Sequence, residues 1–272
     1  LPEHAATGRL VYLETDPVLK LVQLADGAKE VEDLLAPHAA FFTWGLNYGR
    51  PDCGVPLPDR FHFRPTPPVV VPELWEVEPA GPPETFTTIG NWRQLYRDFV
   101  FRGETYTWSK HHEFLKFIDL PRQTDQPFEL ALSTRHFEDD DRRRLAENGW
   151  RVRDAGPLSA DLDAYRGYVA GSRGEFTVAK DANVRLRSGW FSERRAQYLA
   201  AGRPVITQDT GFCGALPTGR GLFAFSTMDE ILDAVGRVNA DYGRHRRAAA
   251  GIAREFFGYD VVLPRMLAEV GL

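Results

Sequence analysis

From Thr85 onward, short β-branched or aromatic runs alternate with longer amphipathic or charged runs. The runs predicted as strands are Thr85–Ile89, Phe128–Leu132, Trp150–Arg153, Glu175–Ala179, Pro204–Thr207 and Leu222–Phe225. The runs predicted as helices are Ser109–Ile118, Asp139–Asn148, Ala160–Ala170, Ser192–Ala201, Met228–Asn239, Gly243–Phe256 and Asp260–Val270. Strands and helices that alternate at this spacing predict a parallel sheet with helices on both faces. Ligands of such sheets bind beyond the carboxyl ends of the strands.

The first part of the chain repeats this pattern in a shorter form. Strands are predicted at Arg9–Leu13 and Ala39–Thr43, with helical segments around Val18–Ala25 and Glu30–Leu35. This region of about eighty residues is small for an α/β domain. We therefore predict an α/β protein with two Rossmann-like domains, of which the N-terminal one is incomplete because sequence before Leu1 is missing.

Prolines mark the expected boundary between the two domains. More than half of the nineteen prolines lie between Pro51 and Pro83, including PTPPVVVP at 65–72. Such a stretch is extended and cannot form a long helix. We interpret it as the end of a first domain, residues 1–82, and the crossing into a second domain, residues 83–258. A proline-rich loop wrapped over one domain is the alternative that composition leaves open.

Composition limits the binding partners and the cellular compartment that we expect for this protein. Of the 272 residues, 43% are hydrophobic and 26% charged, which is ordinary for a soluble globular protein. A net charge of −5 argues against nucleic acid as a partner, so any phosphate must be bound by local basic groups. Cys53 and Cys213 have no metal-ligand spacing and fit a reducing cytoplasm. No apolar run reaches the roughly 18 residues of a membrane span, and we expect a cytoplasmic protein.

The segment between Ser188 and Phe212 has the features of a phosphate-binding corner. Ser192 is predicted to cap a helix that ends before Gly202, and Pro204 prevents its continuation. A polar loop that leads into a helix exposes backbone N–H groups with partial positive charge, which suits a diphosphate. An ordinary helix start is the alternative. The loop residues predicted to contact the ligand are Ser188, Gly189, Trp190, Phe191 and Ser192.

Other candidates follow predicted strands or begin predicted helices. The turn at Gly90, Asn91 and Trp92 opens onto the same sheet edge, and Gly90 would let the backbone approach a ligand, although a plain strand exit explains it equally well. Lys110 lies in the first turn of a helix, where a cation opposes the helix dipole. A phosphate facing Lys110 would offset that cost, and a solvated lysine on a turn is the alternative. Lys180 ends a strand and precedes two arginines, a pattern that can neutralise a diphosphate. His111 and His112 lack a metal-binding spacing, and we expect no metal.

Four segments together resemble a known family. They are TTIGNW at Thr87–Trp92, SKHHEFL at Ser109–Leu115, FTVAKDANVRLRSGWFSERRAQYLAAGRPVI at Phe176–Ile206, and TGFCGALPTGRGLFAFSTMDEILDAV at Thr210–Val235. In this order they resemble the C-terminal domain of GT-B glycosyltransferases, especially the bacterial family similar to glycogen synthases and sucrose synthases. The resemblance implies a metal-independent enzyme without a cofactor, which moves a sugar from a nucleotide-diphosphate donor to an acceptor hydroxyl.

The resemblance also implies roles for individual residues. Lys110 would face the diphosphate, and Asp209, Thr210 and Gly211 would line the floor of the cleft. A terminal helix in residues 259–272 would cross back onto the first domain. Many retaining members carry two glutamates eight positions apart, and this sequence has Gly189 and Gln197 there. Gln197 can still bond a ribose hydroxyl but carries no charge.

These departures leave the stereochemistry and the catalysis open. An inverting reaction needs a general base from the first domain, for which we predict Asp16, with His38 as a weaker candidate. The alternatives are that Asp16 is a turn residue before Pro17 and that the base lies in the missing sequence. Trp44, Asn47 and Tyr48 are candidates to border the acceptor. The alternatives are a nucleotide-sugar epimerase of the same fold and a glycosyltransferase-like protein that binds a nucleotide or sugar without catalysis.

Overall fold

The computed structural model describes residues 9–78, 81 and 83–272. Its larger sheet has six strands, and its strand order is β11-β10-β9-β4-β7-β8 with every pairing parallel. The strands are β4 (Phe86–Gly90), β7 (Phe128–Leu132), β8 (Arg151–Asp154), β9 (Gly174–Thr177), β10 (Val205–Gln208) and β11 (Leu222–Phe225). The predicted strands are thus confirmed, with ends that shift by one or two residues.

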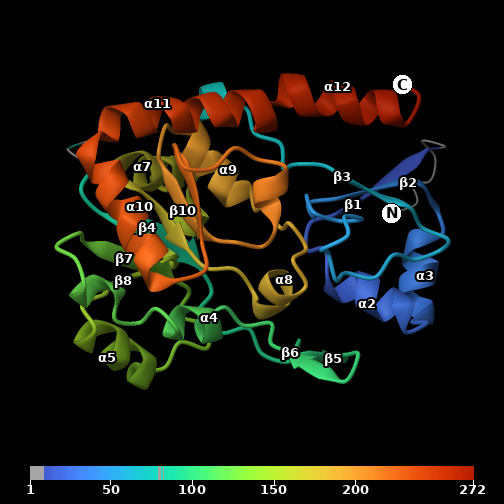
Figure 1. Ribbon diagram of the computed structural model, residues 1–272, viewed down its shortest axis with the longest axis horizontal. Coiled ribbons are helices and arrows are strands. Elements are labelled where there is room, and N and C mark those ends of the chain that lie inside the picture. The colour runs from blue at the N-terminus through green and yellow to red at the C-terminus, as the bar shows by residue number, and fades with distance from the viewer. Residues whose placement is uncertain (1–8, 79–80, 82) are drawn as a thin grey trace.

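Helices cover both faces of this sheet, as Figure 1 shows. One face packs against α4 (His111–Leu115), α5 (Asp139–Glu147) and α10 (Met228–Ala240). The other packs against α7 (Leu162–Gly171), α9 (Glu193–Ala200) and α11 (Tyr242–Ile252). Neighbouring strand residues alternate between the two cores: Val205 belongs to the second cluster and Ile206 to the first. This alternation is why a strand buried on both faces reads as a continuous apolar run.

A second, three-stranded parallel sheet contains β1 (Leu10–Glu14), β2 (His38–Thr43) and β3 (Phe63–Pro65), in that order, with α2 (Leu19–Ala25) and α3 (Lys29–Leu35) between β1 and β2. Strand β3 lies inside the proline-rich stretch, so part of that stretch belongs to the first sheet. Three residues that end in proline give too weak a strand signal to be found by pattern. The boundary predicted at 82 and 83 adjoins residues 79, 80 and 82, which lie outside the described residues, as do residues 1–8.

The C-terminal helices span both sheets (Figure 1). A π-helical turn, η4 (Ala253–Phe257), joins α11 to α12 (Tyr259–Glu269). At the far end of α12, the Arg64 side chain donates to the carbonyl of Glu269 at 3.0 Å, and Arg9 donates to that of Val270 at 3.0 Å. The last helix therefore contacts the first sheet.

Several elements depart from the predicted pattern. A hairpin of β5 (Phe99–Phe101) and β6 (Glu104–Tyr106) precedes α4, and α8 (Asp181–Arg185) follows β9. The helix predicted at 160–170 divides at Asp161, which ends α6 (Gly156–Ala160) and caps α7 by accepting from the Ala164 N–H at 2.6 Å. The short helical turns are η1 (Pro72–Trp75), η2 (Leu120–Arg122) and η3 (Phe212–Gly214). None of the helices in the described part is both long and apolar enough to cross a membrane.

Candidate functional site

The strand order of the large sheet reverses between β4 and β9. From β4 the chain winds outward through β7 and β8, then returns to the other side of β4 to form β9. Connections leave this point in opposite directions, and sheets of this kind bind ligands there, beyond the carboxyl ends of the two strands. We call this position at the end of β4 the crevice. Gly90 ends β4, so the predicted turn does lie at this crevice, followed by exposed Asn91.

A buried ion pair joins α9 to β9. The Arg194 Nε donates to Glu175 Oε1 at 2.6 Å, and the Glu175 side chain is fully buried. Burial alone would lower the pKa of Arg194, but the attraction of Glu175 outweighs it and the net shift is upward. A Cβ atom on Gly90 would lie 4.0 Å from Arg194 Nη1, so the glycine leaves this guanidinium open toward the turn.

Two further cations lie beside this pair. The Lys110 Nζ lies 5.0 Å from the centre of the Trp190 ring, and among the described residues Lys110 has no acidic partner within ion-pair distance. Burial, with the neighbouring charges of Arg194 and Arg195, lowers the pKa of Lys110 well below its ordinary value. Arg195 is fully buried, donates to the Trp190 carbonyl at 3.2 Å, and has a pKa lowered by burial to about 10.

The positive charge of Arg195 is incompletely compensated. Its Nε and Nη2 atoms find no partner in the described part of the chain. Unsatisfied buried donors beside a half-buried lysine favour the arrival of an anion, because desolvated charges attract one another more strongly than solvated ones.

Lys180 and Asp16 meet on the first-domain side of this cluster. The Lys180 ammonium forms an ion pair with Asp16 Oδ2 and lies 3.5 Å from the centre of the Trp108 ring. Burial lowers the pKa of Lys180, although Asp16 opposes that shift. Asp16 Oδ1 is buried without a hydrogen-bond partner among the described residues. The two predicted residues are therefore brought together, and Lys180 is largely engaged by Asp16.

The loop before α9 is occupied by contacts within the protein. The Gly189 N–H donates to the Thr210 carbonyl at 2.6 Å, and the Trp190 N–H donates to Ser188 Oγ at 3.2 Å. The Leu46 N–H in turn donates to the Gly189 carbonyl at 3.1 Å. The prediction that Ser188, Gly189 and Trp190 offer free donors to a phosphate is therefore wrong in this conformation. Their N–H groups and the Ser188 hydroxyl donate within the second domain, and the Gly189 carbonyl accepts from the first domain.

Three more predicted contacts are buried in the interior. Trp92 is 1% exposed and packs against Phe114 beneath α4. Phe191 is fully buried between Phe212 and Phe257. Ser192 precedes α9, but its hydroxyl makes no capping bond. Trp92 and Phe191 are core residues. The predicted contact of their rings with a ligand is wrong, because both rings pack against other apolar side chains in the interior.

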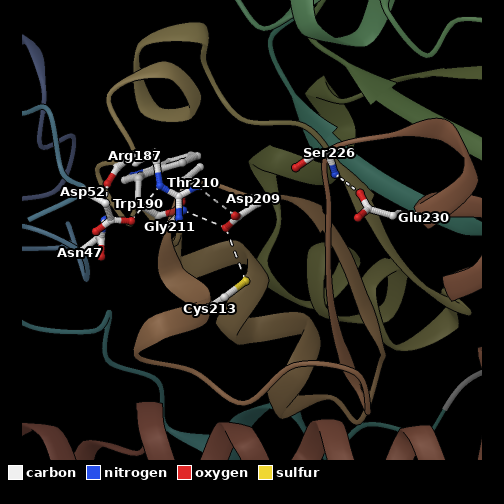
Figure 2. A network of polar contacts seen from close by, with 10 residues as sticks. All are labelled: Asn47, Asp52, Arg187, Trp190, Asp209, Thr210, Gly211, Cys213, Ser226 and Glu230. Atoms are coloured by element: carbon white, nitrogen blue, oxygen red, sulfur yellow. Dashed lines mark hydrogen bonds and ion pairs between the residues drawn. The ribbon is translucent and has the colours of Figure 1, made fainter. Parts of the chain in front are cut away.

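Asp209, Thr210 and Gly211 belong to a network between the two domains (Figure 2). The Arg187 guanidinium bridges Asp52 Oδ2 at 2.9 Å and Asp209 Oδ2 at 3.3 Å. Asp209 Oδ1 accepts from the Gly211 N–H at 2.8 Å, and the Thr210 hydroxyl donates to the Trp190 carbonyl at 2.9 Å. In this structure these residues join the domains, and Asp209 is balanced by Arg187 instead of facing the cation cluster.

No protein-family model and no curated protein matches the chain in sequence. Solved structures do match it. HepE from Anabaena in complex with UDP-glucose aligns with 99% of the chain and 76% of its own length, at 11% identity and a TM-score of 0.61. Sucrose-phosphate synthase from Thermosynechococcus elongatus aligns with 95% of the chain and 66% of its own length, at 12% identity and a TM-score of 0.58. The chain has the GT-B fold.

A third solved structure agrees with this assignment. The glycosyltransferase from Rickettsia africae aligns with 76% of the chain and 56% of its own length, at 10% identity and a TM-score of 0.52. At these identities the likeness establishes the fold. The crevice at Gly90 is therefore the switch point of the C-terminal GT-B domain, and the side that carries Asp16 belongs to the N-terminal domain.

Gln197 lies one turn beyond Glu193 on α9 of the GT-B C-terminal domain. Its Oε1 accepts from the Tyr165 hydroxyl at 2.7 Å, which ties it to α7. Among the acceptor candidates, Tyr48 is buried in the hydrophobic core of the first domain. The Asn47 amide donates to the Arg187 carbonyl at 2.9 Å. These side chains hold the GT-B domains together or pack inside them, so the acceptor role predicted for Asn47 and Tyr48 is not met here.

Sequence reasoning missed Arg194, Arg195 and Glu175. One signal was available, because two arginines in the first turn of a helix oppose the dipole as Lys110 does. Nothing in the sequence marked Glu175 as buried. An acidic residue in a strand is expected to face solvent unless a buried partner for it is known. In the described part of the chain, no group of three or more metal-ligating side chains occurs.

Proposed function

We propose that this protein binds a nucleoside-diphosphate sugar at the crevice beside Gly90 and transfers the sugar to an acceptor hydroxyl. The observation that carries this proposal is the cluster of Lys110, Lys180, Arg194 and Arg195. Among the described residues, Lys180 pairs with Asp16 and Arg194 with Glu175, whereas Lys110 and Arg195 form no ion pair. In a chain with a net charge of −5, such a local excess of positive charge favours a polyanionic ligand. HepE, which has the same fold, binds UDP-glucose in its solved structure.

The cluster is suited to the charge that develops in the reaction. As the acceptor oxygen bonds to the anomeric carbon, the bond to the nucleoside diphosphate breaks and negative charge grows on the leaving group. Preorganised cations in a site of low dielectric stabilise that charge. We propose that Lys110 contacts the diphosphate and that Arg194 and Arg195 contribute from beneath. These side chains supply the charge that a metal would otherwise provide. The rate of sugar transfer should therefore be unchanged when a metal chelator is added.

Asp16 is the proposed general base, acting through its unpartnered Oδ1 while Lys180 holds Oδ2. In this role, Asp16→Asn should abolish sugar transfer while UDP affinity changes little. Binding without catalysis is the second candidate function. It is favoured by the engaged amides of Gly189 and Trp190 and by the neutral Gln197.

Isothermal titration calorimetry of the purified protein with UDP, GDP and TDP measures their affinities and tests the donor site. Removal of the Lys110 ammonium should cost the ligand one charged hydrogen bond, about 1.5 to 3 kcal/mol, or roughly 10- to 100-fold in affinity. Lys29→Ala is the matched control, because Lys29 is 75% exposed on α3 and should leave binding unchanged. No binding of any nucleotide at millimolar concentration, or equal affinity in Lys110→Ala, would contradict the proposal.

A second measurement separates the two candidate functions. The protein is incubated with the sugar conjugate of whichever nucleotide binds, and released nucleoside diphosphate is measured with and without acceptor candidates. Release that is lost in Asp16→Asn supports transfer. Nucleotide binding with no release in the wild-type protein supports the binding-only alternative.

A further inference from the structure

A hollow of about 630 Å³ lies at the opposite edge of the large sheet from the crevice. It is bounded by the loop 217–220, which leads into the amino end of β11, by the last turn of α10 and by the first turns of α11. Because all strands of the sheet are parallel, this edge is remote from the carboxyl ends where Gly90 lies. A ligand here would not compete directly with a donor at the crevice.

Three arginines line the hollow, against a single acid. Arg237 is oriented by the Gly219 carbonyl at 2.6 Å and by Asp233 at 3.5 Å. Arg220 and Arg244 make no ion pair within the described residues, and both side chains are exposed. The acid is Asp241, whose Oδ1 already accepts from the Arg244 N–H at 3.0 Å as the cap of α11. The lining is thus strongly cationic.

His245 adds a directional donor. This side chain is 6% exposed and lines the hollow, and its Nδ1 accepts from the Gly221 N–H at 3.2 Å. Burial, with the charges of Arg237 and Arg244, lowers the pKa of His245, so the ring is neutral near pH 7. A neutral ring that accepts at Nδ1 carries its proton on Nε2, and no partner for Nε2 occurs in the described part of the chain. An N–H donor of a largely buried side chain therefore remains available beside the guanidinium groups.

We propose that this hollow binds a phosphomonoester. Guanidinium groups match the oxygens of a phosphate, and the His245 Nε2–H supplies a further donor to it. Pro217, Ala248 and Ile252 form an apolar wall that would cover the organic part of the ligand. The site is separate from the proposed donor site, since it shares no residue with it.

Calorimetric titration with glycerol 3-phosphate tests this site, with glycerol as the uncharged control. The double variant Arg220→Ala/Arg244→Ala should weaken binding by about tenfold or more, because two charged contacts are lost. Arg247→Ala, an exposed arginine on the same helix that lies outside the hollow, and Lys110→Ala at the crevice should both bind like wild type. NMR of the His245 ring should show a shift of its Nε2 signal on saturation.

Vesicles that contain phosphatidic acid present the same phosphomonoester on a lipid. Binding to these vesicles, but not to glycerol 3-phosphate, with the same dependence on Arg220 and Arg244, would assign the site to a lipid headgroup. The proposal is overturned if neither probe binds, if Arg247→Ala weakens binding as much as the double variant, or if Lys110→Ala alone abolishes it.

Discussion

At the scale of single residues, Arg194 and Glu175 carry the most consequential contact of the crevice. Glu175 is fully buried in β9, and its Oε2 has no hydrogen-bond partner among the described residues. A buried carboxylate is tolerated only while its counter-charge is in place. Arg194 therefore has two tasks, because it compensates Glu175 and also contributes positive charge to the proposed donor site.

Arg194→Ala should lower the free energy of unfolding by about 3 to 5 kcal/mol, because it leaves Glu175 buried and unpaired. Arg143→Ala is the control. Arg143 is 66% exposed and pairs with an 80% exposed Asp140, so its loss should cost no more than about 1 kcal/mol. Urea denaturation measures both. Adding Glu175→Gln to Arg194→Ala should restore part of the lost stability. Equal stabilities of Arg194→Ala and Arg143→Ala would contradict this account.

At the scale of elements, two helices that both begin after a hydroxyl residue behave differently. Ser192 stands at the N-cap of α9, but its buried hydroxyl finds no partner in the described part of the chain. Thr227 caps α10 fully: its Oγ1 accepts from the Glu230 N–H at 3.3 Å, and the Glu230 carboxylate accepts from the Thr227 N–H at 3.0 Å. Figure 2 shows Glu230 accepting also from the Ser226 N–H.

Thr227→Ala should therefore destabilise the protein by about 1 kcal/mol, the usual cost of a lost cap. Ser192→Ala should be neutral or slightly stabilising, because it removes a buried polar atom that lacks a partner. Thermal unfolding followed by circular dichroism compares the two. A loss in Ser192→Ala as large as that in Thr227→Ala would show that Ser192 does cap α9.

The loop before α9 depends on a glycine at position 189. Gly189 has φ +77°, and a Cβ atom there would lie 2.0 Å from the backbone nitrogen of Asn47. Gly27 has a similar φ of +79° with nothing within 4 Å. Gly27→Ala should thus cost only the backbone strain, about 1 to 2 kcal/mol. Gly189→Ala should cost roughly 1 to 3 kcal/mol more, since it also forces the domains apart. Equal losses in urea denaturation would rule out the tight contact.

At the scale of the whole molecule, the two domains share a hydrophobic core. The cluster around Val18 and Leu21 of the first domain also contains Phe101 and Tyr106 of the hairpin and Leu186 beyond α8. Residues from the second domain thus complete the core of the first domain. Arg187 and the end of α12 add polar contacts between the halves.

A shared core predicts a single cooperative unfolding transition. Leu186→Ala, at 6% exposure, should lower the stability of the entire protein by about 2 to 5 kcal/mol. Leu57→Ala, at 63% exposure, should have little effect. Differential scanning calorimetry distinguishes the outcomes. Two resolved transitions, of which Leu186→Ala moves only one, would mean that the domains unfold independently.

The amino-acid pattern alone predicts the parallel sheet of the second domain and the helices on its two faces. It also directed attention to the strand exit at Gly90 and to Lys110. These features are local: the period of apolar residues sets the element, and residues at the carboxyl ends of parallel strands meet at one edge whatever else the chain does. Short strands such as β3, with its proline, lacked a period long enough to be found.

Which polar groups remain available to a ligand depends on contacts between distant parts of the folded chain. The Trp190 indole donates to the carbonyl of Thr15, 175 positions away, and the amide of Asn47 donates to the carbonyl of Arg187, 140 positions away. No local pattern records such distant pairings, so the loop at Ser188 looked free when it is a contact between domains. Burial then selected the charges that matter, because a cation attracts an anionic ligand more strongly where water is excluded. Residues from several separate segments of the chain bury Arg195 fully and Lys110 and Arg194 in part, and of these three cations Arg194 already has an acidic partner in Glu175.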